Sequence, residues 1–438
     1  MTAPPPASRQ LALRWLQLGL AALVFAGIYA ILLVSSRTPG VAEHLPWLDF
    51  FHTALVVHVD LSVLIWFLSL SGVLWTWGSA GPLPALDRPA LWLAAAGTAL
   101  IVLSPFTGEG KPLINNYVPV LQQPVFLAGL GLFGGGILLK GLAALAARSI
   151  APAPLAMGLR LAAFTTLVSI LLLPVSHLMI LPRVGGAGYY ELLFWGPGHV
   201  LQLTHTLLVL VVWIGLAPLS PGPAGRRLLG ALFLLIALPV VVAPLIYGAG
   251  GIDGGEFRNR FTTFMRHGGL ASLPLLLYAL HLWFRRRVEG DAPVAAAMRG
   301  SLLLFVAGGI LGFMIEGVNV VIPAHYHGSI VGITLAYMGL AYALLPRLGI
   351  PLTLPRLARW QAWIYTVGQL MHISGLAWSG GYGVARKVAG SAQGLEQLQA
   401  IWGMRLMGAG GGIAIIGGVL FLVVCLHALW RGRGQESQ

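Results

Sequence analysis

Cysteine and charge are what this chain of 438 residues has least of. Cys425 is its only cysteine, which excludes an internal disulfide, a Cys-x-x-Cys-His haem attachment and a thiolate-bridged copper centre. Charged residues make up 9% of the chain and hydrophobic residues 57%. A soluble globular protein does not usually contain so large a fraction of hydrophobic residues and so few charged ones. We therefore expect a polytopic membrane protein.

Acidic residues are scarcer than basic ones, with 13 Asp and Glu against 26 Lys and Arg and a net charge of +13. The basic residues lie in short segments between apolar stretches, a pattern that sets membrane topology and does not indicate binding to a phosphate backbone. We therefore expect a lipid bilayer, and no nucleic acid, among the partners.

Twelve apolar stretches are long enough to cross about 30 Å of hydrocarbon as helices. They cover residues 11–35, 50–77, 89–106, 120–146, 160–182, 190–217, 227–248, 260–284, 297–318, 320–346, 359–380 and 408–430. We predict an all-α fold with a single integral membrane domain over residues 1–438 and cytoplasmic tails at 1–10 and 431–438. With both termini inside, 17 of the 26 Lys and Arg fall on the cytoplasmic side, as the positive-inside rule requires. A bacterial inner (plasma) membrane is the expected location.

His325 and His327 form the most specific motif, a His-x-His pair in the sequence Ala324-His325-Tyr326-His327-Gly328. Positions two apart on an α-helix point roughly 200° apart, so one helix offers an imidazole to either side. Imidazole inside a membrane is expensive and usually functional, and it is a common ligand of haem iron. The pair therefore predicts a helix that lies between two haems.

Three other spans place a histidine at the depth of this pair. In the predicted topology His58 on the second span, His199 on the sixth and His267 on the eighth all fall in the outer half of the membrane. Independent core histidines would not be expected to gather in one layer, so we predict that these side chains bind cofactors. His205 on the sixth span and His372 on the eleventh are weaker candidates.

The number of spans and the order of these histidines resemble subunit I of the haem-copper oxidases, a superfamily that includes the nitric oxide reductases. The resemblance covers essentially the whole chain and implies the twelve-helix arrangement of that subunit. It implies a low-spin haem between His58 and His327 and a high-spin haem on His325. It also implies that His199 ligates a second metal, copper or non-haem iron.

The second-metal site departs from the family pattern. A His-His pair normally completes it, but here the chain reads Phe264-Met265-Arg266-His267-Gly268, so only His267 matches. Two imidazoles alone make a poor copper or iron site. The missing ligand of the second metal is supplied by His205, by Glu316 or by no residue of the chain.

The resemblance also bears on residues other than histidine. Arg386 and Lys387, just beyond the eleventh span, match the basic pair that binds haem propionates in this family; otherwise they are an ordinary loop pair. Leu203 stands four residues after His199, where some oxidases have a tyrosine and nitric oxide reductases a glutamate. Tyr247 on the seventh span either takes the place of that tyrosine or serves as an interfacial anchor.

The function implied is that of the catalytic subunit of a respiratory terminal oxidoreductase. Electrons from a cytochrome c-type subunit or a membrane quinol would pass from the low-spin haem to a high-spin haem/metal centre at His325, His199 and His267, where dioxygen or nitric oxide is reduced. The alternative is a haem-bearing sensor or assembly protein without the second metal. It stays open because Arg266 stands where the family has a histidine that ligates this metal. A twelve-helix transporter is less favoured, because the chain shows no convincing internal repeat.

Overall fold

The computed structural model describes residues 3–45, 50–217, 221–285 and 292–435. They are almost entirely helical, apart from a short antiparallel hairpin of β1 (Lys111–Leu113) and β2 (Val120–Gln122). The prediction of a helical fold is confirmed. Arg286 and Arg287 are two of the 17 Lys and Arg predicted to be cytoplasmic, and they lie outside the described residues. So do residues 1–2 and 436–438 of the predicted tails.

The chain divides into two compact units. Unit 1 comprises Met1–Ala22 and Val59–Arg285, and unit 2 comprises Leu23–His58 and Arg286–Gln438. Helix α1 (Pro6–Arg37) contributes to both units, and so does the helix that begins as α2 (Phe51–Val59) and continues through the π-helical η3 (Asp60–Ile65) into α3 (Trp66–Trp77). The expectation of a single membrane domain stays a prediction.

Prolines set where several helices of unit 1 begin. The first residue is proline in α4 (Pro84–Leu103), α5 (Pro124–Ala146) and α8 (Pro223–Ala237), where its missing N–H costs nothing because no helical partner exists. The other α-helices of this unit are α6 (Ala153–Met179), α7 (Gly186–Gly215), α9 (Ala243–Gly248), α10 (Gly255–Leu270) and α11 (Leu273–Leu280).

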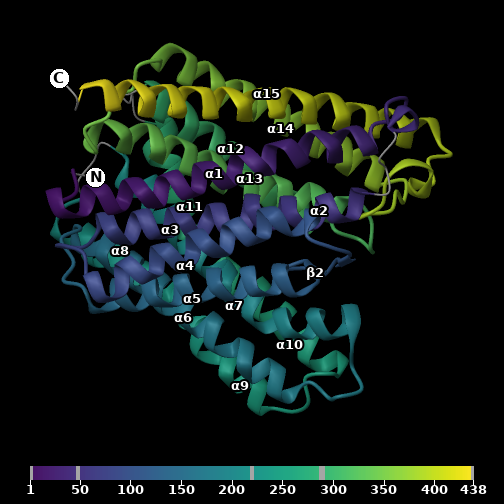
Figure 1. Cartoon of the computed structure of the whole chain (residues 1–438), viewed down its shortest axis with the longest axis horizontal. Coiled ribbons are helices and arrows are strands. Elements are labelled where there is room, and N and C mark those ends of the chain that lie inside the picture. Colours follow the sequence, from purple (N-terminus) through teal and green to yellow (C-terminus); the bar gives the residue numbers. More distant parts are fainter. Residues whose placement is uncertain (1–2, 46–49, 218–220, 286–291, 436–438) are drawn as a thin grey trace. The chain divides into compact units, whose positions relative to one another are not determined.

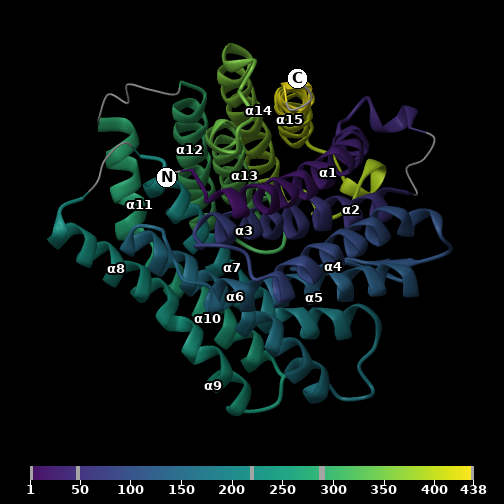
Figure 2. The ribbon, with the colours of Figure 1, turned by 60° about the vertical axis from the view of Figure 1, so that its left-hand side comes forward.

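The long helices of unit 2 pack closely against one another. Its long helices are α12 (Ala292–Phe313), α13 (Val321–Arg347), α14 (Pro355–Gly380) and α15 (Leu398–Gln435). α12 lies along α13, and α14 along α15 (Figures 1 and 2). A Cβ on Gly308 would strike the backbone of Gly328, and one on Gly375 would strike the backbone of Met407. Small residues therefore let these helices approach closely, as in other membrane proteins.

Ten of the described helices are long and apolar enough to cross a membrane, which supports an integral membrane protein. The predicted eighth and eleventh spans are not among the ten, so the count of twelve is not confirmed. The eighth, predicted over 260–284, is broken after Leu270, and its first part α10 is rich in charge. The eleventh, predicted over 359–380, lies within α14, whose polar side chains lower its hydropathy.

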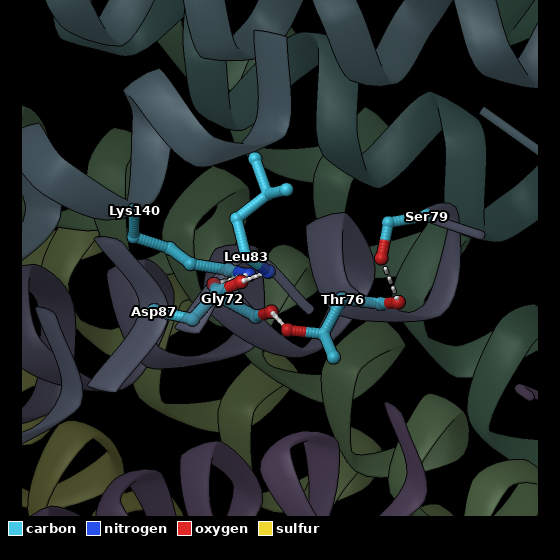
Figure 3. A network of polar contacts seen from close by, with 6 residues as sticks. All are labelled: Gly72, Thr76, Ser79, Leu83, Asp87 and Lys140. Carbon is cyan, nitrogen blue, oxygen red and sulfur yellow. Dashed lines mark hydrogen bonds and ion pairs between the residues drawn. The ribbon is translucent and has the colours of Figure 1, made fainter. Parts of the chain in front are cut away.

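A buried ion pair joins α4 to α5. Lys140 Nζ lies 2.7 Å from Asp87 Oδ1, and the two side chains are only 2% and 5% exposed. The other carboxylate oxygen of Asp87 accepts a hydrogen bond from the Leu83 N–H at 2.7 Å. Figure 3 shows Lys140 reaching Asp87, with Thr76 and Ser79 nearby, each bonded through its hydroxyl to a backbone carbonyl. Each charge of the pair depends on the other, because a single buried charge is costly.

Candidate functional site

Three histidines of unit 2 form an imidazole cluster: His58 on α2, His327 on α13 and His372 on α14. The rings of His327 and His372 lie 5.0 Å apart between centroids and are tilted by 48°. His58 and His372 are both close enough to His327 to interact with it electrostatically. The structure thus brings together the two residues predicted to hold one haem and adds a third imidazole from the predicted eleventh span.

Backbone carbonyls fix the protonation pattern of the imidazole cluster. Each Nδ1 lies at a carbonyl oxygen: Ala26 for His58 at 2.9 Å, Pro323 for His327 at 2.8 Å and Met407 for His372 at 3.0 Å. A carbonyl only accepts hydrogen bonds, so in the neutral ring Nδ1 carries the proton and Nε2 the lone pair. Metal-ligating histidines usually adopt this arrangement. The cluster therefore fits a haem iron bound through Nε2.

His325, also in unit 2, contacts a different helix from His327. Its Nδ1 donates to the carbonyl oxygen of Gly308 on α12 at 2.7 Å. A Cβ on Gly312 would strike the His325 ring, so glycine leaves the space that the imidazole occupies. The two histidines of the pair therefore face α12 and α14 separately, as positions two apart on a helix should.

His199 lies in unit 1, on α7, among aromatic rings. Its ring centroid is 4.9 Å from that of Tyr117, 4.9 Å from that of Trp195 and 5.5 Å from that of Phe261. Its Nδ1 donates to the Trp195 carbonyl at 2.6 Å, which again leaves the lone pair on Nε2. His199 is 2% exposed, so this imidazole is held in one orientation by its surroundings.

Tyr117, which the sequence did not single out, comes from the loop between β1 and β2. Asn115 Oδ1 accepts from the Tyr117 N–H at 2.9 Å, and Glu191 on α7 accepts from the Asn116 N–H at 3.1 Å. A Cβ on Gly198 would strike the Tyr117 ring. Burial and the nearby Glu191 carboxylate hold the pKa of the Tyr117 hydroxyl well above its ordinary value. The hydroxyl is therefore neutral at physiological pH, and the one sequence signal for this contact is the glycine beside the α7 histidine.

Phe261, and not His267, is the α10 residue that contacts His199. Phe261 lies on the buried face of α10, whereas His267 is exposed and its Nδ1 donates to the Thr263 carbonyl at 3.0 Å. Within the parts of the chain that are described, no three His, Cys, Asp or Glu side chains are grouped to hold a metal ion. The role predicted for His267 stays a prediction.

His205 and Glu316 were considered as further ligands of the second metal, and Tyr247 as a replacement for the family's tyrosine. His205 packs edge-on against Phe67 with centroids 5.0 Å apart, and among the described residues its buried Nδ1 has no hydrogen-bond partner. Tyr247 has its hydroxyl 2.6 Å from that of Ser176. Glu316, in unit 2, is exposed.

The predicted basic pair lies close to the His-x-His motif in unit 2. Arg386 interacts electrostatically with Tyr326, the residue between the two histidines. Lys387 has a φ of 63°, in the left-handed region that few non-glycine residues adopt, and its carbonyl lies 3.2 Å from His52 Nε2. The segment after α14 is thus held near the imidazole cluster.

Comparison with known proteins gives one family model and several relatives. The model described as Cytochrome C and Quinol oxidase polypeptide I matches residues 10–411. An uncharacterized protein of Rickettsia prowazekii (strain Madrid E) is 30% identical over 98% of each chain. One of Aquifex aeolicus (strain VF5) is 29% identical over 76% of this chain and 84% of its own. A cryo-EM structure of a heme-copper terminal oxidase dimer is similar in fold, with a TM-score of 0.74 at 18% identity, covering 96% of this chain and 84% of that one.

Proposed function

The chain belongs to the cytochrome c and quinol oxidase polypeptide I family, which is subunit I of the haem-copper oxidases, and from that premise we propose that it is the catalytic subunit of a respiratory complex that reduces dioxygen or nitric oxide. Enzymes of this family are membrane oxidoreductases that bind haems and a copper or iron centre. The observation that carries the proposal is the imidazole cluster, in which the Nδ1 of each ring lies at a backbone carbonyl.

In this proposal different histidines bind different cofactors. His58 and His327 hold a low-spin haem, His325 holds a high-spin haem, and Arg386 and Lys387 bind propionates. When bound, the haems supply one-electron transfer and an iron position open to a diatomic gas. The chain's own part is to orient the rings: the carbonyls that accept from Nδ1 fix which nitrogen faces the metal.

The second metal, copper or non-haem iron, is assigned to His199 and His267. His199 supports this assignment because it is buried and its Nδ1 is already bonded to a carbonyl. The contact between His199 and Phe261 favours a second candidate function, a haem-bearing sensor or assembly protein without the second metal. Metal analysis of the purified complex decides between them, because the reductase contains one copper or non-haem iron per chain and the sensor contains neither.

Electrons would come from a cytochrome c-type subunit or a membrane quinol, in a bacterial inner membrane with both termini cytoplasmic. Gas-consumption assays on the purified complex, with each donor and with dioxygen or nitric oxide, test the reaction directly. We expect consumption of at least one of the two gases. A complex that consumes neither gas with either donor would contradict the proposal.

Replacing Tyr117 with Ala should lower turnover roughly ten- to a hundredfold, because small displacements of an active-site group are that costly. The Tyr117 ring packs on the His199 ring and helps to fix its orientation. The Tyr117→Phe variant keeps the ring and serves as the matched control, with turnover close to wild type. Both variants should keep the low-spin haem spectrum. Equal turnover in the Ala variant and wild type would show that the ring contact does not position His199.

A further inference from the structure

Helix α15 carries a tryptophan–arginine pair near each of its ends. The Arg405 Cζ lies 5.0 Å from the centre of the Trp402 ring, and the Arg431 Cζ lies 5.3 Å from the centre of the Trp430 ring. The two tryptophans are about 42 Å apart along the helix at 1.5 Å per residue. That length matches the roughly 40–45 Å of a bilayer with its headgroup regions, at whose surfaces tryptophan is enriched. Each pair therefore lies at the level of lipid headgroups.

The exposed faces of α14 and α15 are apolar between these levels. On α15 a row of exposed side chains, spaced by three or four residues, leads to Trp430: Ile416, Val419, Val423 and Leu426. On α14 the exposed Val367 lies two turns after Trp360, which is 66% exposed. Both faces suit acyl chains, and both end in a tryptophan at the same end of unit 2.

The start of α14 lies beside the end of α15. Thr353 Oγ1 and His427 Nδ1 are 2.7 Å apart and share a hydrogen bond. A Cβ on Gly432 would lie 3.3 Å from the Ile350 side chain. These contacts hold together the two chain segments that carry Trp360 and Trp430. A ligand at the headgroup level can therefore meet side chains of both helices.

Three arginines, which we call the arginine cluster, lie at this end of unit 2: Arg356 and Arg359 near the start of α14, and Arg431 near the end of α15. All three are exposed, and none forms an ion pair among the described residues. Residues 317–395 and 397–435 contain no Asp or Glu, so α13, α14 and α15 bring no carboxylate to the cluster. Guanidinium groups pair well with phosphate. The cluster therefore favours a phosphate-bearing anion at the membrane surface.

We propose that the arginine cluster binds the headgroup of an anionic phospholipid, whose acyl chains lie on the exposed apolar faces of α14 and α15. A zwitterionic phospholipid has the same phosphate, but its own cationic group is repelled by the arginines. Anionic lipids are abundant in the cytoplasmic leaflet, on which the predicted topology places this end of the chain. Membrane orientation alone requires only positive charge here, whereas a headgroup site also selects among lipids.

The triple variant Arg356→Gln/Arg359→Gln/Arg431→Gln tests this selectivity. The purified full chain is placed in phosphatidylcholine vesicles, and its relative affinity for spin-labelled phosphatidylglycerol and phosphatidylcholine with the same acyl chains is measured. Wild type should prefer phosphatidylglycerol at least about tenfold. Each arginine removed should lower that preference by up to about fivefold, so that the triple variant binds both lipids equally.

The matched control is Arg183→Gln/Arg258→Gln/Arg405→Gln, which removes three exposed arginines that lie outside the cluster and changes the net charge equally. It should keep the wild-type preference for phosphatidylglycerol. Loss of the preference in this control would show that net charge, and not the arginine cluster, selects the lipid.

Arg431→Gln alone decides the matter if the triple variant does not assemble, with an expected loss of about fivefold in the preference. The site would be overturned if wild type bound both lipids equally, or if the variant that assembles kept the full wild-type preference. Neither result bears on haem binding or gas reduction, which the proposed function predicts independently.

Discussion

His327→Ala should remove the low-spin haem spectrum and leave carbon monoxide binding by the second haem intact. The reason is that His327 and His325 face different helices, so that loss of one imidazole leaves the other anchored to Gly308. A haem with two histidine ligands has no open position, whereas a haem with one binds carbon monoxide when reduced. Difference spectra of the reduced protein, with and without carbon monoxide, measure both properties in one sample.

His372→Ala is the matched control for this experiment. His372 lies 5.0 Å from His327 between ring centroids and has the same Nδ1 arrangement. The assignment predicts that the low-spin spectrum survives this change. If His372→Ala removed the spectrum and His327→Ala did not, the ligand from the cluster would be His372. If both signals survived in His327→Ala, this histidine would hold no haem.

Lys140→Met should destabilise the protein by about 3–5 kcal/mol, the usual cost of removing one partner from a buried ion pair. Among the described residues, the change leaves the buried Asp87 carboxylate with the Leu83 N–H as its one remaining donor. We expect little folded protein after extraction, measured as recovery and midpoint temperature in detergent.

A second change should restore much of the stability that Lys140→Met loses. The double variant Lys140→Met/Asp87→Asn has no buried charge and keeps an acceptor for the Leu83 N–H. Replacing a buried pair by neutral residues is often nearly neutral in stability. If Lys140→Met were as stable as wild type, the pair would not be buried as described.

Local sequence patterns predicted most of the helices and the single helix on which His325 and His327 lie. Apolar stretches set the helices because backbone groups inside a membrane must bond to one another, and proline marks where α4, α5 and α8 begin. The spacing of His325 and His327 is a property of one helix, so their separate directions follow from sequence alone.

The role of Tyr117 could not be predicted in the same way. The contact of Tyr117 with His199 depends on how the loop between β1 and β2 folds against α7. The sequence did contain a signal for the break after α10, because Arg258, Arg260 and Arg266 lie close together in this segment. Charge at that density is uncommon inside hydrocarbon.

Haem content per chain, measured together with the fraction that binds carbon monoxide, tests the central claim most directly. The claim is that histidines of α2 and α13 hold two haems, one with both axial positions filled and one with an open position. We expect two haems per chain, of which one binds carbon monoxide after reduction. A protein that contains no haem, or in which every haem binds carbon monoxide, would contradict it.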